Sequence, residues 1–395
     1  MKVVLAYSGG LDTSICIKWL QEHYKADVVT LTLELGQGEK DLREIEQKAK
    51  SLGARKTYSI DCREEFVQHY INPAIRANAL YESKYPVATA IARPLIGKHL
   101  ARTAEKEKAD AVSHGSTGKG NDQVRFELAV RALNPDLKII APAREWDLTR
   151  DKAIEFAKKE GIPIPVDVNS PYSTDENLWG RSVEAGPLED PMHQPSEDVY
   201  KWTASPEKAP DKPEYVKIGF EHGVPVSLDA QEMDEVKLIQ KLNGLGGKHG
   251  IGRIDMIEDR LVGIKSREIY ECPAATIVLE AHKDLERLTL TREEVIFKET
   301  VDSRWAQLAY FGQWYEPLMH DLNSFIAKTQ ESVSGTVRMK LYKGSATVVG
   351  RESENSLYDL GLATYDKADK FDHKLAEGFV RLWGLPSEIA SRRKR

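Results

Sequence analysis

Small and hydroxylated residues crowd one short run near the start of the chain, Tyr7-Ser-Gly-Gly-Leu-Asp-Thr-Ser14. Its two glycines let a ligand approach the backbone closely, and the helix expected to follow turns its N–H groups and dipole toward that ligand. Its hydroxyl side chains add hydrogen-bond donors, so the run predicts a cradle for a phosphate chain. The run holds no lysine and fits neither the Walker A nor the GxGxxG pattern. The alternative is a glycine turn whose Asp, Ser or Thr side chain caps the helix.

A second polar run lies between another predicted strand and helix and reads His114-Gly-Ser-Thr-Gly-Lys-Gly-Asn-Asp-Gln-Val-Arg125. It is not a Walker A loop, because it lacks the first glycine and the final Ser or Thr of that pattern. Asp122 can accept from an ammonium group, Asn121 can donate and accept, and Arg125 offers a fork for a carboxylate. These groups suit a zwitterionic amino acid, while the alternative is that the Asn-Asp pair caps the helix.

The first run resembles the SGGxD(S/T)S pyrophosphate loop of the N-type ATP pyrophosphatases, and the phrase from Ala6 to Ser14 resembles that loop in the argininosuccinate synthase family. The second run is similar to the family's (A/S)TGKGNDQVRFE stretch. Three more segments resemble the family, at residues 82–94, 173–182 and 258–270. The likeness extends in pieces from Val3 to about residue 350.

The resemblance implies a ligase that condenses L-citrulline and L-aspartate to argininosuccinate while ATP becomes AMP and pyrophosphate. It implies a citrullyl-adenylate intermediate, with ATP as co-substrate and Mg²⁺ on its phosphates, mostly coordinated by water and near Asp12. We assign no general base, and the candidates for a catalytic role are Asp12, Arg93 and Asp122.

The resemblance also implies which residues hold each substrate. For ATP they are Ala6, Tyr7, Ser8, Gly9, Gly10, Leu11, Asp12, Thr13, Ser14, Leu33 and Gly115. For citrulline they are Tyr85, Ala90, Asn121, Arg125, Ser173, Ser182, Glu258 and Tyr270. For aspartate they are Thr89, Thr117, Asn121 and Asp122.

The sequence departs from the family pattern in two of these segments. Ala90 stands where the family has a serine, so either Thr89 supplies the hydroxyl or that contact is missing. Trp179-Gly-Arg181 replaces a more usual Leu/Met-His-Ile, which predicts an altered local shape. Without the resemblance, Glu258 reads as a surface charge and Tyr85 as a half-buried aromatic.

The elements that must position these residues follow from apolar periodicity. Short apolar segments alternate with amphipathic ones over about 165 residues, which predicts a doubly wound parallel sheet, an α/β nucleotide-binding domain. The predicted strands are Val3–Ala6, Val28–Leu33, Lys56–Ile60, Ala109–Ser113 and Leu137–Ala141. Predicted helices include Ser14–His23, Ile91–Lys106 and Val124–Leu133.

The pattern changes near Pro163. Seven of the 18 prolines fall between Pro171 and Pro213, so this stretch is expected to be a linker or long loop with little regular structure. Further on, the pattern predicts an α+β domain. Its predicted strands are Tyr215–Phe220, Val224–Leu228, Val262–Lys265, Thr336–Leu341 and Ser345–Val349, and its helices Glu232–Asn243 and Asp302–Thr329. The glycine-dense run Gly244–Gly252 is expected to be a loop.

We predict three parts: an ATP-binding domain at 1–166, a synthetase domain at 167–362, and a C-terminal helix with a basic tail at 363–395. The segment Asp366–Trp383 carries an apolar stripe of Phe371, Leu375, Phe379 and Leu382. Such a stripe packs on its own domain or grips another subunit. The resemblance implies the second alternative and a homotetramer.

Composition limits the partners. The 395 residues include 56 Lys and Arg against 62 Asp and Glu, a net charge of -6, so nothing favours nucleic acid. No apolar run is long enough to cross a membrane, and the start of the chain shows no signal peptide. The three cysteines form no CxxC and the ten histidines no HExxH, which predicts no disulfide framework, no structural metal site and a reducing cytoplasm.

Three rival functions are weaker. A tRNA thiolase needs a reactive cysteine pair and a basic RNA face, and a glutamine-dependent amidotransferase needs a nucleophilic cysteine domain. A nucleotide-binding regulatory module without turnover would leave the polar groups of 121–125 and 173–182 without purpose.

Overall fold

The computed structural model describes residues 1–38, 42–146, 150–163 and 171–393. The first part of the chain forms a five-stranded parallel sheet in the order β3-β2-β1-β4-β5. Its strands are β1 (Lys2–Ala6), β2 (Asp27–Glu34), β3 (Lys56–Asp61), β4 (Ala111–Ser113) and β5 (Lys138–Ile140). Its helices are α1 (Leu11–Tyr24), α2 (Leu42–Ser51), α3 (Arg63–Phe66), α4 (Asn72–Arg76), α5 (Ala92–Glu107), α6 (Asn121–Leu133), α7 (Pro142–Glu145) and α8 (Arg150–Lys159), with a π-helical turn at Val67–Ile71.

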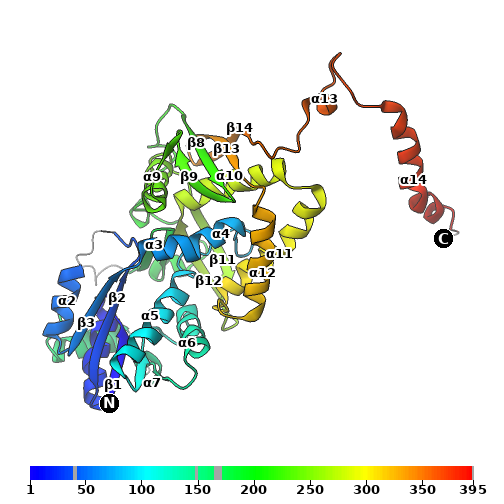
Figure 1. The fold of residues 1–395 in the computed structure, drawn as a ribbon. Helices are drawn as coiled ribbons and strands as arrows, with labels where there is room; N and C mark the ends of the chain where they lie inside the picture. The colour runs from blue at the N-terminus through cyan, green and yellow to red at the C-terminus, as the bar shows by residue number, and fades with distance from the viewer. Residues whose placement is uncertain (39–41, 147–149, 164–170, 394–395) are drawn as a thin grey trace.

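Helices cover both faces of this sheet (Figure 1). Val3 and Leu5 of β1 lie in one core with α1 and α8, whereas Val4 lies in the other core with α5 and α6. Alternate residues of a strand point to opposite faces. Because both faces are covered, all three side chains are fully buried. The predicted doubly wound parallel sheet is confirmed.

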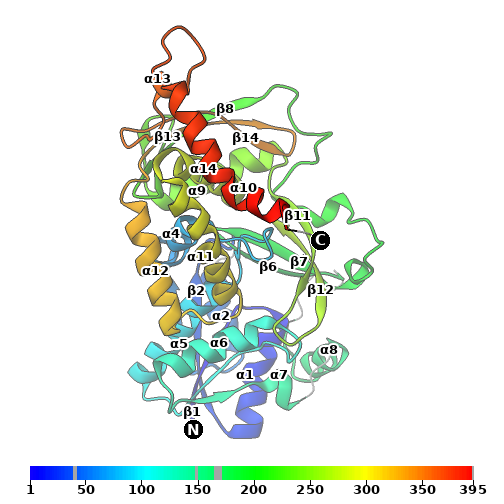
Figure 2. The ribbon, with the colours of Figure 1, turned by 90° about the vertical axis from the view of Figure 1, so that its right-hand side faces the viewer.

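The second part contains two antiparallel sheets, ordered β10-β9-β8-β13-β14 and β11-β12-β7-β6. Figure 2 shows the sheet with β6, β7 and β12 between β1 below and β8, β13 and β14 above. The strands are β6 (Ser173–Asn177), β7 (Gly180–Glu184), β8 (Glu214–Glu221), β9 (Val224–Leu228), β10 (Gln231–Glu232), β11 (Arg253–Asp259), β12 (Lys265–Glu271), β13 (Gly335–Tyr342) and β14 (Ser345–Glu352). The helices are α9 (Glu235–Lys248), α10 (Pro273–Thr289), α11 (Arg292–Tyr310) and α12 (Pro317–Gln330), with 3-10 turns at Gly186–Glu189 and Glu197–Val199.

The single helix expected at Asp302–Thr329 is instead two, α11 and α12. Gly312 between them has φ +76°, a left-handed conformation that ends a helix, and Pro317 begins the next helix at its first position. A Cβ atom on Gly312 would lie 2.8 Å from the Cα atom of Arg125. The break therefore lets the backbone of the second part lie directly against α6.

The glycine-dense run 244–252 was expected to be a loop, but residues up to Lys248 belong to α9. A Cβ atom on Gly246 would lie 2.8 Å from Pro273 Cβ, and one on Gly247 would lie 2.1 Å from the carbonyl oxygen of Trp202. These glycines permit close helix packing, which local sequence does not distinguish from a turn.

Two further expectations are corrected. The proline-rich stretch 171–213 contains the hairpin β6–β7 as well as the 3-10 turns, so it holds more regular structure than predicted. The strand expected at Val262–Lys265 is mostly the turn between β11 and β12, where Gly263 has φ +87°.

A buried polar cluster joins the segment after α4 to α10 and α11. Lys298 Nζ donates to the carbonyl oxygen of Arg76 at 2.7 Å and to Asp302 Oδ1 at 2.8 Å. Asn78 Nδ2 donates to Glu286 Oε2 at 2.7 Å, and Lys298 is only 1% exposed. Buried charges are tolerated when they are paired in this way, so an early segment of the chain is fixed among late helices.

The chain ends in an arm with α13 (Leu360–Ala363) and α14 (His373–Ser391), and Figure 1 shows it reaching away from the rest of the molecule. No residue of α14 is buried, and its Leu375 and Leu382 are 71% and 74% exposed. The predicted boundary between 166 and 167 and the last two residues of the basic tail lie outside the described residues. No helix in the described part of the chain is long and apolar enough to cross a bilayer.

Candidate active site

The loop between β1 and α1 is an open cradle. Gly10 is the N-cap residue of α1 and no side chain caps the helix, so the alternative of a capped turn is not what the structure shows. The Oγ atom of Ser8 lies 3.2 Å from Thr13 Oγ1 and 3.4 Å from Gly10 N. Gly9 has φ +76°, and a Cβ atom there would lie 3.1 Å from Ile45 Cγ1. Because the first N–H groups of an α-helix have no partners within the helix, the N-terminus of α1 is suited to an anion.

Two predicted ATP-binding residues anchor this loop from beneath. The hydroxyl groups of Tyr7 and Ser14 lie 3.1 Å apart, and Ser14 is fully buried. The backbone of Tyr7 donates to Leu31 O at 2.8 Å and accepts from Thr32 Oγ1 at 2.8 Å. Ser14 therefore supports the cradle, while Ser8 and Thr13 are the hydroxyls near its surface.

The sheet order brings the two polar runs of the sequence together. β4 pairs directly with β1, so the loops that follow these two strands meet at the carboxyl edge of the sheet, where the strand order reverses. A Cβ atom on Gly115 would lie 3.2 Å from Thr13 Cγ2 and 3.6 Å from Thr13 N. Gly115 thus lies against the cradle, and its part in ATP binding stays a prediction.

Asp122 lies between two guanidinium groups. Arg93 donates to Asp122 Oδ2 through Nε at 2.9 Å and Nη2 at 2.7 Å, and Arg125 Nη1 donates to Oδ1 at 3.0 Å. Arg93 also pairs with Asp175 of β6. Burial alone would raise the pKa of Asp122, but Arg93 and Arg125 outweigh it and lower that pKa to about 2. The Asp122 carboxylate is therefore charged at neutral pH. The N-cap residue of α6 is Gly120, so the alternative that the Asn-Asp pair caps this helix is not what the structure shows.

Glu258 is held by two tyrosines. Tyr270 donates to Glu258 Oε2 at 2.7 Å, and Tyr310 donates to Oε1. Tyr310 also accepts a hydrogen bond from Asn121 Nδ2 at 2.8 Å. Glu258 is 2% exposed, so its interpretation as a surface charge is wrong. Burial raises the pKa of this carboxyl, although the two hydroxyl donors counteract the effect.

Tyr85 and Thr89 continue this network. Tyr85 Oη lies 2.9 Å from Thr89 Oγ1 and accepts from Thr89 N at 2.9 Å, while its ring stacks on Tyr270 at 4.0 Å. Tyr85 is 1% exposed, more buried than its sequence alone suggests. Ala90 is fully buried, and Thr89 Oγ1 is bonded to Tyr85, so whether Thr89 replaces the family's serine stays a prediction. Val87 has φ +47°, a strained conformation for a β-branched residue that costs about 1–3 kcal/mol and is typical of functional sites.

The hairpin β6–β7 lies against this segment. Asn177 Nδ2 donates to Ala88 O at 2.9 Å, and the indole N–H of Trp179 donates to Pro86 O at 3.2 Å. Trp179, one of the three residues that depart from the family pattern, is fully buried where the two parts of the chain meet. Ser182 donates to Asp175 O at 3.5 Å.

Two predicted ligands lie at the margin. Ser173 is exposed at the start of β6, and Thr117 is exposed in the loop before α6. Leu33 is buried near the end of β2 and Asp12 is exposed in the first turn of α1. Hydrogen bonds join Arg93, Asn121, Arg125 and Tyr270 to the Asp122 and Glu258 networks, and Tyr85, which is bonded to Thr89, stacks on Tyr270. The Ser182 hydroxyl instead bonds to the backbone of Asp175.

Sequence reasoning missed Tyr310 and Asp175. Tyr310 ends α11, 52 residues after Glu258, and no local pattern marks it. Asp175 lies between the two serines of the segment 173–182, where its acidic side chain was a signal that could have been used.

The three thiols are buried and free. Burial raises the pKa of Cys16 and of Cys62 to about 12, and raises that of Cys272 as well. They are protonated at neutral pH, which disfavours the thiolase and amidotransferase alternatives.

Comparison with known proteins gives two family matches. A model described as the arginosuccinate synthase N-terminal HUP domain matches residues 2–163, and one described as the arginosuccinate synthase C-terminal domain matches residues 172–390. The argininosuccinate synthase of Oceanobacillus iheyensis is 57% identical over 390 residues, covering 99% of this chain and 93% of that protein. That of Pyrococcus furiosus is 56% identical over 390 residues, covering 99% and 94%. A U34-tRNA thiolase structure from Methanococcus maripaludis aligns with 42% of this chain and 58% of its own chain. Its sequence identity is 16% and its TM-score 0.28, so the likeness is weak.

Proposed function

The chain belongs to the argininosuccinate synthase family, and we propose that its two polar networks and the cradle form one site at the carboxyl edge of the parallel sheet. Members of this family are ligases that form a C–N bond between citrulline and aspartate, with ATP as co-substrate. One observation carries the placement: Gly115 lies against the cradle, and Asn121 and Asp122, a few residues further on, belong to the two networks.

Each network suits one end of an amino acid. The charged carboxylate of Asp122 is proposed to bind the α-ammonium group of the aspartate substrate. This group, once deprotonated, is the nucleophile of the reaction. Glu258 is proposed to receive the α-ammonium group of citrulline, and Arg125 and Asn121 its carboxylate. Tyr85 and Thr89 would line the same pocket.

We propose that pyrophosphate departs toward the N-terminus of α1, where the helix dipole and the backbone N–H groups of the loop stabilise it. The ureido oxygen of citrulline attacks the α-phosphorus, forming an O–P bond as the bond to pyrophosphate breaks. The aspartate ammonium group first releases a proton to solvent, and the resulting amine attacks the ureido carbon. The C–O bond to AMP breaks as the C–N bond forms, and a second proton on the nitrogen passes to solvent. Holding the three groups in line supplies an effective molarity of about 10⁵ M or more.

Mg²⁺ is proposed to arrive with the ATP phosphates. The exposed carboxylate of Asp12 and the hydroxyls of Ser8 and Thr13 are hard oxygen groups that fit a mostly hydrated ion. The ion would offset phosphate charge, and the chain's own N–H groups would orient the leaving group.

A pyrophosphate-release assay tests the function directly. Release that requires ATP, citrulline and aspartate together is expected, and release with other amino acids, or with none, would contradict the proposal. With ¹⁸O in the ureido group of citrulline, the label is expected in AMP by mass spectrometry. ADP and phosphate as products, or unlabelled AMP, would exclude the adenylate route.

We further propose a homotetramer held by the exposed apolar arm, division into domains at 1–166, 167–362 and 363–395, and a reducing, cytoplasmic location. The exposed stripe on α14 supports the first, and the three free thiols support the last.

A further inference from the structure

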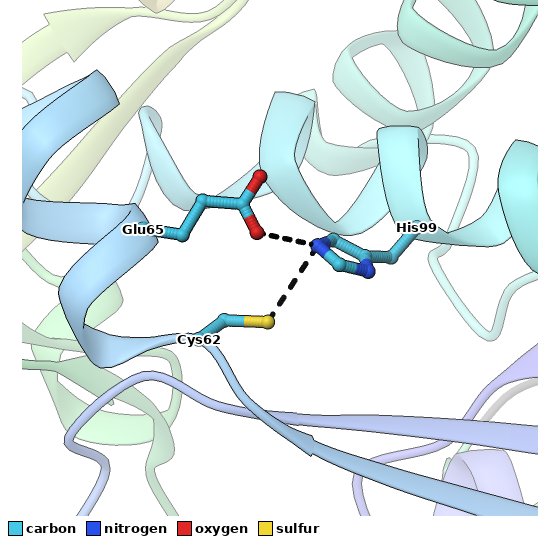
Figure 3. A group of neighbouring side chains, drawn as sticks. All are labelled: Cys62, Glu65 and His99. Atoms are coloured by element: carbon cyan, nitrogen blue, oxygen red, sulfur yellow. Dashed lines mark hydrogen bonds and ion pairs between the residues drawn. The ribbon is translucent and has the colours of Figure 1, made fainter.

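Three side chains with metal-binding atoms meet away from the candidate active site, between the end of β3 and α5 (Figure 3). Cys62 follows β3 directly, Glu65 lies in α3, and His99 lies in α5. Cys62 Sγ is 3.6 Å from His99 Nε2, and Glu65 Oε2 is 2.8 Å from the same nitrogen. All three atoms lie within 4.8 Å of one another, and no other such trio occurs among the residues that the structure describes.

One imidazole nitrogen faces both partners. A ring nitrogen carries either one hydrogen or one lone pair, so it can satisfy only one of the two fully. With a hydrogen, it donates to Glu65 and leaves the sulfur of Cys62 with a weak contact at 3.6 Å. A cation between the three atoms would accept a lone pair from each.

The ligand types select the metal. Thiolate, imidazole and carboxylate together are typical of Zn²⁺, whose tetrahedral bonds of about 2.0–2.3 Å place donor atoms roughly 3.3–3.6 Å apart. The sulfur–nitrogen distance already fits. The nitrogen–oxygen distance must widen by roughly half an ångström, which the Glu65 side chain can allow because it is 25% exposed.

The surroundings meet two further needs of a metal site. Lys98 Nζ lies 2.7 Å from Glu65 Oε1, which fixes that oxygen and leaves Oε2 for the ion. The Glu65 side chain is 25% exposed, so a water molecule from solvent can reach the cluster beside it.

We propose that Cys62, Glu65 and His99 form a Zn²⁺ site with one water as the fourth ligand. Binding transfers the thiol proton to solvent and involves no redox change. The ion would clamp α3 to α5, the helix that carries Arg93, six residues before His99. The sequence predicts no metal site here, because Cys62 and His99 are 37 residues apart and form no local motif. The proposal therefore departs from that expectation.

Metal binding to the untagged full-length protein tests the site. Chelator-stripped protein is dialysed against Zn²⁺ alone and its metal content measured by mass spectrometry. One equivalent per chain is expected, with at least a tenfold weaker affinity in Cys62→Ser, His99→Gln and Glu65→Gln. Cys16→Ser is the matched control, because it removes an equally buried thiol from the opposite core and should retain the metal. Co²⁺ in place of Zn²⁺ should give a thiolate charge-transfer band that Cys62→Ser abolishes.

Several results would overturn the assignment. They are the absence of stoichiometric Zn²⁺, equal binding by wild type and the three ligand variants, or Zn²⁺ that excess Mg²⁺ displaces. Circular dichroism of the metal-free variants shows whether each is folded. Glu65→Gln keeps the test decisive if a buried substitution disrupts the fold, since its side chain is partly exposed.

Discussion

Asp122 is charged and paired on both sides, so replacing it with Asn keeps its shape and removes its charge. We expect Asp122→Asn to raise KM for aspartate roughly 10- to 100-fold, because a hydrogen bond to a charged group contributes about 1.5–3 kcal/mol. The change in KM for citrulline should be much smaller. Because the pKa of Asp122 is lowered to about 2, its carboxylate charge is lost only as pH falls toward that value. The ratio of variant to wild type should therefore stay constant from pH 6 to 9. Equal rises in both KM values would contradict the assignment.

Tyr310 is the donor that couples Glu258 to Asn121. In Tyr310→Phe the ring can still stack on Tyr81, 3.6 Å away, while Glu258 loses a hydrogen bond that favours its charged form. The pKa of Glu258, already raised by burial, should rise further. We expect KM for citrulline to rise about tenfold. The increase of this KM at low pH should begin at a higher pH than in wild type, because a protonated carboxyl no longer attracts an ammonium group.

Tyr81→Phe is the matched control for this variant, since the Tyr81 hydroxyl donates to Asp259 O and not to Glu258. A pH profile of KM for citrulline, measured from pH 5.5 to 8, separates the two. Superimposable profiles for Tyr310→Phe and wild type would show that the hydroxyl has no positioning role.

At this scale, sequence predicted the residues that sit inside continuous motifs. Asn121, Asp122 and Arg125 share one run, and their residue types already indicated ligands for an amino acid. Tyr310 could not be predicted, because its role depends on how α11 packs against α6, a contact between residues almost 190 positions apart. Glu258 needed the resemblance, since burial of a carboxylate is decided by distant side chains.

Among the elements, the loops after β1 and β4 must fit closely for the cradle to form. Gly115→Ala would place a methyl group 3.2 Å from Thr13 Cγ2 and crowd the start of α1. We expect KM for ATP to rise several-fold while KM for citrulline changes little.

Gly118→Ala is its control in the same loop, because the added methyl would lie 3.6 Å from an aliphatic carbon of Arg144, an ordinary contact. Steady-state kinetics with ATP varied measures both. If the two variants behave alike, the close approach of Gly115 does not matter to nucleotide binding.

The elements themselves were predictable where periodicity was strong. The five parallel strands and α5 follow from apolar patterns within a residue or two. The break between α11 and α12 and the helical glycines of α9 were not predicted, because glycine serves as a helix terminator in one case and as a packing surface in the other. Only tertiary contacts distinguish these uses.

At the scale of the whole molecule, the C-terminal arm exposes the apolar side chains of α14, which indicates that another subunit covers them. Deleting the residues after Tyr365 removes α14 and its exposed apolar side chains, so we expect a lower mass by multi-angle light scattering. The double variant Leu375→Glu and Phe379→Glu should have the same effect in the full-length chain, because buried charge opposes association. A full-length protein that is already monomeric would refute this role of the arm.

The buried cluster around Lys298 has a consequence for synthesis of the protein. Within this cluster, the residues that bond to Asn78 and to the carbonyl oxygen of Arg76 lie 204 to 224 residues further along the chain. At a translation rate of about 5–20 residues per second, the ribosome needs roughly 10–45 s to supply them. For that time Asn78 and the carbonyl oxygen of Arg76 lack these partners, so the nascent segment exposes polar groups that the finished protein buries, and a chaperone that holds it would protect it until they arrive.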